Sequence, residues 1–144
     1  MSDTFLSIKN ISKTFGSVTV VDDFNLDVAR GEFVSFLGPS GCGKTTVLRM
    51  VAGFEEPSAG QIVVGDKDVP RLKPNQRNVG MVFQAYALFP NLTVAQNVGF
   101  GLKIAGMPRA EADRRVAEML DLIKLPLPQF GDRYPYQLSG GQQQ

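Results

Sequence analysis

The chain has 144 residues, 43% of them hydrophobic and 20% charged, a composition that excludes a disordered or fibrous protein and is typical of one ordinary globular domain. Its 15 basic and 14 acidic residues leave a net charge of +1, so no charge excess favours binding to nucleic acid or to an anionic membrane surface. Cys42 is the single cysteine, which excludes an internal disulfide and fits a reducing compartment.

Targeting and membrane signals are weak in this sequence. No stretch reaches the roughly 20 consecutive apolar residues that a membrane-spanning helix needs. Residues 1–4 have neither the basic nor the apolar region of a signal peptide. These features predict a cytoplasmic protein that attaches to a membrane only through a partner.

The N-terminal part of the chain predicts strands. Residues 5–10 and 18–28 are rich in Val, Ile and Phe, and they predict an antiparallel flank. Arg30 and Gly31 predict a turn. Residues 32–37 form an apolar run that is short enough for a buried strand.

A helix is expected to follow, beginning at Gly43 or Lys44 and ending at Gly53. Its expected apolar face consists of Val47, Leu48, Val51 and Ala52. Residues 55–60 predict a turn, and residues 61–64 and 79–83 predict two further strands separated by a polar, proline-punctuated stretch.

The remaining part of the chain predicts helices. Thr93 followed by Gln96 is a capping box that predicts a helix reaching about Ala105. A second helix is expected over about residues 109–124, and residues 126–137 predict a returning loop. The apolar residues of the second helix recur at helical spacing: Val116, Met119, Leu120 and Ile123.

A glycine-rich motif joins the predicted strand at residues 32–37 to the helix that follows it. The motif is Gly38-Pro39-Ser40-Gly41-Cys42-Gly43-Lys44-Thr45. Glycines leave room for backbone N–H groups to surround phosphates at the positive end of a helix, where Lys44 reaches the outer phosphates. Thr45 is the expected Mg²⁺ ligand, and Thr46 adds a second phosphate contact. The motif therefore predicts binding of a nucleoside triphosphate, whereas a plain glycine-rich turn is the alternative.

A second motif lies at residues 138–142, Leu138-Ser139-Gly140-Gly141-Gln142, and is called the signature below. A serine cap and two glycines predict a helix start that can receive an anion. A glycine-rich linker with a serine cap is the alternative reading.

Together the two motifs give the chain a resemblance to the ATP-binding subunit of an ABC transporter, over about residues 6–144. The resemblance implies an α/β P-loop NTPase (ABC ATPase) core with an antiparallel β flank and an α-helical subdomain, with the C-terminal part missing. It implies a nucleotide-binding core at residues 1–84, a helical subdomain at residues 85–137 and the start of the signature region at residues 138–144.

The same resemblance implies partners and a location. The signature would face the P-loop of a second ATPase subunit, so that two subunits enclose two ATP molecules head to tail. Integral membrane permease subunits, and indirectly a substrate-binding protein, are the other implied partners, without nucleic acid. The subunit is then expected at the cytoplasmic face of the cell membrane.

Further residues take roles only through the resemblance. Gln84 matches the glutamine that contacts Mg²⁺ and the attacking water in this family, although a glutamine after a strand is usually a plain loop residue. Phe15 lies where the family stacks an aromatic ring on adenine, with Val20 near the ribose, although an aromatic residue before a glycine is otherwise most often a turn residue that covers a core. The apolar surface that meets the permease is expected at Tyr86, Leu88 and Phe89; simple core packing is the alternative.

Two hydrolytic elements of the family are not found in these 144 residues. An apolar strand ending in Asp-Glu and a later histidine are absent, and Met119-Leu120-Asp121 lies inside a helical pattern. We therefore expect a fragment of a longer ATPase subunit that binds ATP without turning it over. Missing central strands also predict poor solubility for the isolated chain.

The transported substrate is predicted least directly, because the ATPase does not touch it. Residues 78–90 and the closing Gln142-Gln143-Gln144 look most like importers of polyamines or ferric iron, followed by sugar importers. A non-transport ABC protein and an inactive nucleotide-binding module remain the alternatives. Co-purification with membrane subunits distinguishes the first of these, and ATP binding without phosphate release supports the second.

Overall fold

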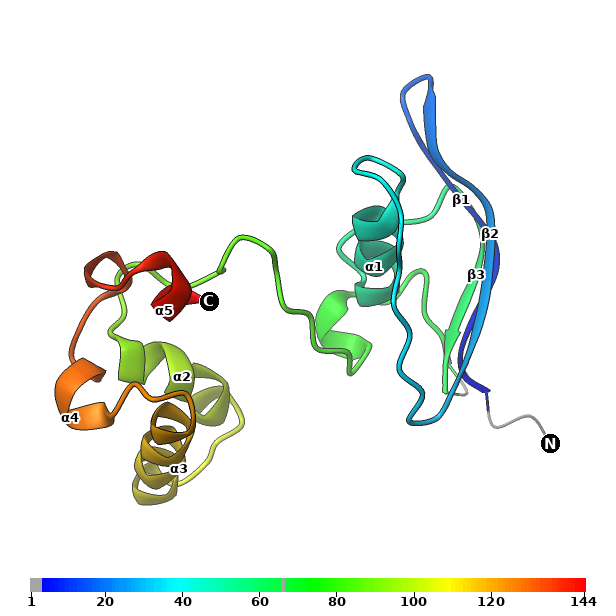
Figure 1. The fold of residues 1–144 in the computed structure, drawn as a ribbon. Coiled ribbons are helices and arrows are strands. Elements are labelled where there is room, and N and C mark those ends of the chain that lie inside the picture. Colours follow the sequence, from blue (N-terminus) through cyan, green and yellow to red (C-terminus); the bar gives the residue numbers. More distant parts are fainter. Residues whose placement is uncertain (1–3, 66) are drawn as a thin grey trace. The chain divides into compact units, whose positions relative to one another are not determined.

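The computed structural model describes residues 4–65 and 67–144, which form two compact units. The first unit extends to Met81 and the second comprises Val82–Gln144, and each is described by itself (Figure 1). The first unit holds the described strands, one α-helix and a short 3₁₀ helix, whereas the second is helical. The domain assignment made from the sequence stays a prediction.

The first unit is built on an antiparallel sheet with the strand order β2-β1-β3-β4. The strands are β1 (Thr4–Phe15), β2 (Val18–Ala29), β3 (Ala59–Val64) and β4 (Lys67–Asp68). β1 pairs with β2 on one side and with β3 on the other. The antiparallel flank and the strand at residues 61–64 are thus confirmed, and β3 also takes in Ala59 and Gly60, which were expected in a turn.

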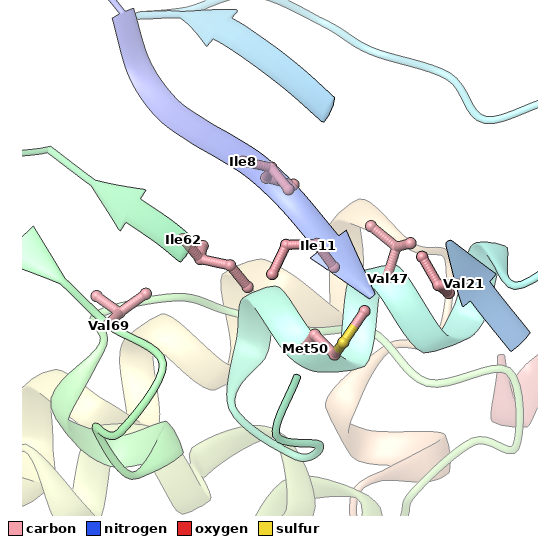
Figure 2. Packing of buried hydrophobic residues seen from close by; sticks show 7 residues of the cluster. All are labelled: Ile8, Ile11, Val21, Val47, Met50, Ile62 and Val69. Atoms are coloured by element: carbon pink, nitrogen blue, oxygen red, sulfur yellow. The ribbon is translucent and has the colours of Figure 1, made fainter. Parts of the chain in front are cut away.

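Helix α1 (Lys44–Ala52) packs against this sheet and begins and ends where the glycines predict. Figure 2 shows Val47 and Met50 of α1 directed toward side chains of β1 and β2. The buried core of the unit is Ile8, Ile11, Val21, Val47, Met50, Ile62 and Val69. The expected apolar face of α1 is partly wrong, because Leu48 is 50% exposed and Met50 takes the buried position.

The strands predicted at residues 32–37 and 79–83 are wrong for this chain. Both segments lack regular secondary structure. Phe33, Leu37 and Val82 are 91%, 100% and 96% exposed. An apolar run becomes a strand only when a neighbouring strand accepts its backbone hydrogen bonds, and no described strand pairs with either segment.

The second unit is formed by helices α2 (Val94–Ile104), α3 (Arg109–Leu122), α4 (Leu127–Phe130) and α5 (Gly140–Gln143). One-turn 3₁₀ helices lie at Pro135–Gln137 here and at Pro74–Gln76 in the first unit. The core of the second unit is Val94, Val116, Leu120, Leu125, Phe130 and Leu138.

The predicted ends of the helices are largely confirmed. Thr93 caps α2 by accepting a hydrogen bond from Gln96 N (3.3 Å), while Gln96 Oε1 accepts from Thr93 N (2.9 Å). α3 ends at Leu122, earlier than expected, so Ile123 lies beyond the helix and is exposed rather than on its buried face. The loop predicted at residues 126–137 contains the short α4.

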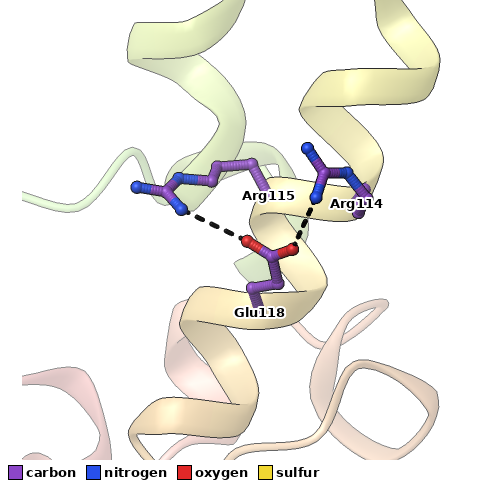
Figure 3. Close-up of polar contacts among 3 residues, drawn as sticks. All are labelled: Arg114, Arg115 and Glu118. Carbon is purple, nitrogen blue, oxygen red and sulfur yellow. Dashed lines mark hydrogen bonds and ion pairs between the residues drawn. The ribbon is translucent and has the colours of Figure 1, made fainter.

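The outer face of α3 carries charged pairs. Glu118 lies between Arg114 and Arg115, with N–O distances of 3.0 and 3.2 Å (Figure 3). Pairs of this kind at i,i+4 and i,i+3 contribute little at an exposed surface. Within residues 4–65 and 67–144, no helix is both long and apolar enough to cross a bilayer.

Candidate nucleotide-binding site

The phosphate loop, residues 38–45, leads directly into α1. Gly43 is the N-cap of α1 with φ of 89°, a conformation that favours glycine. A Cβ atom at this position would lie 2.9 Å from Val20 O and 3.0 Å from Val21 Cγ2. Gly43 therefore allows the start of α1 to approach the backbone of β2 closely, which fixes the loop against the sheet.

The ammonium group of Lys44 lies across the phosphate loop. Its Nζ donates hydrogen bonds to Gly38 O (2.8 Å) and Pro39 O (2.6 Å), and Cys42 Sγ is 3.4 Å away. The side chain thus curls over its own loop and places a positive charge next to the backbone at the start of α1. Backbone N–H groups and a cation at a helix start are the features that bind a phosphate.

A cavity of about 420 Å³ adjoins this loop. β2 contributes Val20 and Phe24 to its wall, and the phosphate loop contributes Cys42, Gly43 and Lys44. Val20, expected near a ribose, therefore lies beside the phosphate loop. Phe15, expected to stack on adenine, does not line the cavity; it lies at the end of β1, half-exposed, with Lys13 Nζ 4.8 Å from the centre of its ring.

The segment around Gln84 belongs to the second unit. Gln84 and Tyr86 are exposed, and Leu88 is half-buried. Phe89 packs on Phe100 of α2 with a centroid distance of 4.5 Å. Asn97 of α2 holds the same segment in place through both amide atoms, with Phe89 among its partners.

The signature has one buried anchor and an exposed tip. Leu138 is buried in the core of the second unit, while Ser139, Gly140 and Gly141 are exposed. Ser139 is the N-cap of α5, and its backbone N–H donates to Gln142 Oε1 (3.0 Å). The predicted helix start at the signature is therefore confirmed.

The signature and the segment that follows Gln84 lie next to each other. A Cβ atom at Gly140 would lie 3.4 Å from the hydroxyl oxygen of Tyr86. Gln143 Nε2 also donates to Pro135 O (2.8 Å), which ties α5 to the preceding turn. The signature and the segment that follows Gln84 therefore lie in the same region of the second unit.

An apolar groove of about 810 Å³ lies on the second unit between α2 and α3. Its walls include Leu92, Phe100, Met107, Val116 and Leu127. One of the residues that line the groove, Phe100, also contacts Phe89 of the segment that follows Gln84.

The structure brings the residues of the phosphate loop together at the start of α1. Thr45 lies in the first unit and Gln84 in the second, so their shared Mg²⁺ role stays a prediction. Among the described residues there is no cluster of three or more His, Cys, Asp or Glu side chains that could hold a metal ion.

Two residues with many contacts were missed by the sequence reasoning, namely Arg77 and Asn97. Each donates hydrogen bonds from one side chain to several backbone carbonyl groups. A polar residue in a loop or on an amphipathic helix gives no sequence signal of such contacts.

One family model matches most of this chain. The family model described as "ABC transporter" matches residues 21–144. That range includes the phosphate loop, Gln84 and the signature.

Curated relatives match along almost the whole chain. The "Fe(3+) ions import ATP-binding protein FbpC" of Escherichia coli (strain K12) is 52% identical over 140 residues, covering 97% of this chain and 40% of the relative. The "Spermidine/putrescine import ATP-binding protein PotA" of Thermobifida fusca (strain YX) is 54% identical over 146 residues, covering 96% of this chain and 37% of the relative. The chain thus spans about 40% of the length of the curated relatives that it matches.

Solved structures also match along almost the whole of this chain. The dimeric structure of MJ0796, a bacterial ABC transporter cassette, aligns with a TM-score of 0.86 at 32% identity, covering 96% of this chain and 65% of that one. The same cassette in a post-hydrolysis state bound to ADP and Pi gives the same values. The expected fold class is therefore confirmed.

Proposed function

Since the chain belongs to the ABC transporter family, we propose that it forms the nucleotide-binding part of an importer's ATPase subunit. The observation that carries this proposal is the phosphate loop, where Lys44 lies over the start of α1 and Gly43 seats that helix on β2. A loop of this shape next to a cavity is suited to a triphosphate.

ATP binding is proposed to depend on the phosphate loop, whose backbone N–H groups and Lys44 hold the β- and γ-phosphates. Lys44 must exchange the Gly38 and Pro39 carbonyls for phosphate oxygens. This exchange is favourable because an ammonium group gains more from an anion than from a neutral carbonyl.

The remaining contacts to the nucleotide are proposals from the family. The Thr45 hydroxyl and the Gln84 side chain would ligate Mg²⁺, which neutralises phosphate charge when bound. The adenine would stack on Phe15, whose half-exposed ring is accessible at the end of β1. The exposed Ser139, Gly140 and Gly141 would contact the ATP of a second subunit.

Transport is proposed to depend on permease subunits in the membrane. The groove between α2 and α3, together with Tyr86, Leu88 and Phe89, offers an apolar surface for a helix of such a partner. The chain would then lie at the cytoplasmic face of the membrane. Ferric iron or a polyamine is the proposed cargo, because these are named for relatives that are 52% and 54% identical.

Hydrolysis is proposed to need residues beyond this sequence, namely an acidic pair after an apolar strand and a histidine. The DNA downstream of the Gln144 codon tests this directly. An open frame that encodes both features supports a working ATPase, whereas a stop codon immediately after Gln144 would leave only a nucleotide-binding remnant.

ATP binding itself is tested by titrating the chain with a fluorescent ATP analogue and displacing it with ATP. Lys44→Ala should weaken binding at least about tenfold, because charge-assisted hydrogen bonds to phosphate are lost. Lys103→Ala, a change of another lysine in the second unit, is the matched control and should bind as the parent does. Equal affinity of the Lys44→Ala variant and the parent would remove the phosphate loop from the proposal.

A further inference from the structure

Arg77 is the one buried charged residue among those that the structure describes, with 4% of its surface exposed. Its guanidinium group donates hydrogen bonds to carbonyl oxygens on two separate segments. The acceptors are Met50 (2.6 Å), Val51 (3.1 Å), Pro70 (3.0 Å) and Leu72 (2.8 Å). Arg77 therefore connects the end of α1 to the loop that precedes the 3₁₀ helix Pro74–Gln76.

The two segments joined by Arg77 meet at a glycine. Gly53, the residue that ends α1, has φ of 85°, and a Cβ atom there would lie 2.5 Å from Arg77 Nε. The guanidinium group thus rests directly on the Gly53 backbone. A side chain at position 53 would displace it.

Among the described residues, no carboxylate lies within 4 Å of the Arg77 guanidinium group. Its hydrogen-bond acceptors are neutral backbone carbonyl groups. Burial lowers the pKa of Arg77, and the nearby negative charge of Glu56 opposes that shift. Arginine still stays protonated, since its ordinary pKa lies far above neutral pH. A cation at the C-terminal end of α1 also interacts favourably with the helix dipole, so the end of α1 is the place where this charge is best accommodated.

Helix α1 has nine residues, so its two ends are about 12 Å apart at a rise of 1.5 Å per residue. Lys44 and Thr45 form the opposite end from Met50 and Val51. Because the backbone hydrogen bonds of so short a helix connect one end to the other, holding one end constrains the direction of the whole helix. Because hydrogen bonds to a charged donor are stronger than neutral ones, the Arg77 contacts are well suited to that task.

We propose that Arg77 is a positioning residue for nucleotide binding, which holds α1 in the orientation that aims Lys44 and Thr45 at the phosphates. The proposal rests on the proposed function of the phosphate loop. It assigns a role to a residue that makes no contact with the phosphate loop itself.

The test compares affinity for ATP in the complete subunit encoded by this gene, with two variants. Arg77→Met removes all four hydrogen bonds while keeping most of the side-chain volume. Arg77→Lys keeps the charge but not the planar fork, so its ammonium can serve α1 or the loop but not both. We expect a loss of affinity of about tenfold for Arg77→Met and a smaller loss for Arg77→Lys.

General destabilisation is separated from positioning by core variants. Ile8→Val and Ile8→Ala remove core volume from β1 but leave every hydrogen bond of Arg77 in place, so they give two graded losses of unfolding temperature for comparison with the Arg77 variants. All variants are measured at a temperature where each is folded. If the Ile8 variants lose affinity in proportion to their own loss of unfolding temperature, the positioning role is overturned.

A double-mutant cycle gives the readout that a purely structural role would not produce. If Arg77 acts through the position of Lys44, Arg77→Lys should cost much less affinity in the Lys44→Ala background than in the parent. Equal losses in both backgrounds would contradict the proposal even if Arg77→Met fails to fold. A parent subunit that does not bind ATP would instead contradict the proposed function.

Discussion

The side-chain amide of Asn97 forms hydrogen bonds with both backbone polar groups of Phe89. Its Oδ1 accepts from Phe89 N (2.8 Å), and its Nδ2 donates to Phe89 O (3.1 Å). The same Nδ2 also lies within hydrogen-bond distance of the carbonyl oxygens of Leu92 (3.1 Å) and Thr93 (3.0 Å). One amide on α2 therefore fixes the segment that carries the proposed permease surface.

Replacing Asn97 should destabilise the second unit. Asn97→Ala leaves several backbone groups without their partner, and we expect the free energy of unfolding to fall by roughly 1–3 kcal/mol. Asn97→Asp keeps the acceptor for Phe89 N but places a carboxylate next to three carbonyl oxygens, so it should be no less damaging. Urea denaturation measures the loss, and amide exchange at Phe89 locates it.

Glu118→Gln is the matched control for the Asn97 variants. It removes two exposed ion pairs from α3, and the expected change is below about 1 kcal/mol. If Glu118→Gln costs as much as Asn97→Ala, then the contacts of Asn97 are not what stabilises this unit.

Two glycines in different surroundings should respond oppositely to alanine. Gly60 has φ of 92°, and a Cβ atom there would overlap the backbone carbonyl of Asn10, where β3 passes β1. Gly60→Ala should therefore destabilise the chain by more than about 2 kcal/mol, since strain and overlap add. Thermal unfolding monitored by circular dichroism measures this change.

Gly101 is the contrasting position. It lies within α2, with nothing within 4 Å of the place that a Cβ atom would take. Gly101→Ala should stabilise the chain by about 0.5–1 kcal/mol, because alanine is the better helix former. A destabilised Gly101→Ala variant would mean that this face of α2 is covered in solution.

Sequence reasoning worked where the signal is local. The capping box at Thr93, the glycines at the ends of α1 and the Val-, Ile- and Phe-rich composition of residues 5–10 and 18–28 are each local signals, and the helices and strands that they predict are found. The phosphate loop and the signature were readable because their spacing is specific.

Sequence reasoning failed where the signal is not local. The apolar run at residues 32–37 has the composition of a strand, yet pairing depends on a partner strand, and none of the described strands pairs with it. Arg77 looks like an ordinary polar residue in the sequence, yet it donates hydrogen bonds to four backbone carbonyl groups. Backbone carbonyls are present at every position, so no side-chain pattern indicates which of them will come close to Arg77. The burial of Arg77 and the carbonyl groups to which it donates are therefore known only from the structure.

Alanine at Gly43 should affect both folding and nucleotide binding. The φ of 89° is strained for alanine, and its Cβ would press on Val20 O, so we expect roughly 1–3 kcal/mol of destabilisation. The start of α1 must move away from β2, which carries Lys44 with it. Calorimetric unfolding and an ATP titration of the same sample measure the two effects.

Gly41→Ala is a useful companion to Gly43→Ala. Its φ of 82° imposes similar backbone strain, but nothing lies within 4 Å of its Cβ position. Gly41→Ala should therefore lose stability through strain alone, and less than Gly43→Ala. Equal losses at both positions would show that the close approach of Gly43 to β2 contributes nothing.

The exposed apolar side chains of Phe33, Leu37 and Val82 should limit solubility. Each is more than 90% exposed, so replacing them with polar residues removes no described core packing. The triple variant Phe33→Gln, Leu37→Gln, Val82→Thr should stay monomeric at higher concentration and bind less of a hydrophobic dye, with its unfolding temperature unchanged. Light scattering measures the association state, and dye fluorescence measures the exposed apolar surface. The control is a second triple variant, Ile8→Gln, Val47→Thr and Ile62→Gln, which places polar groups in the buried core and should fail to fold. A parent chain that is already monodisperse and binds no dye would contradict the expectation, because these side chains would then be covered in solution.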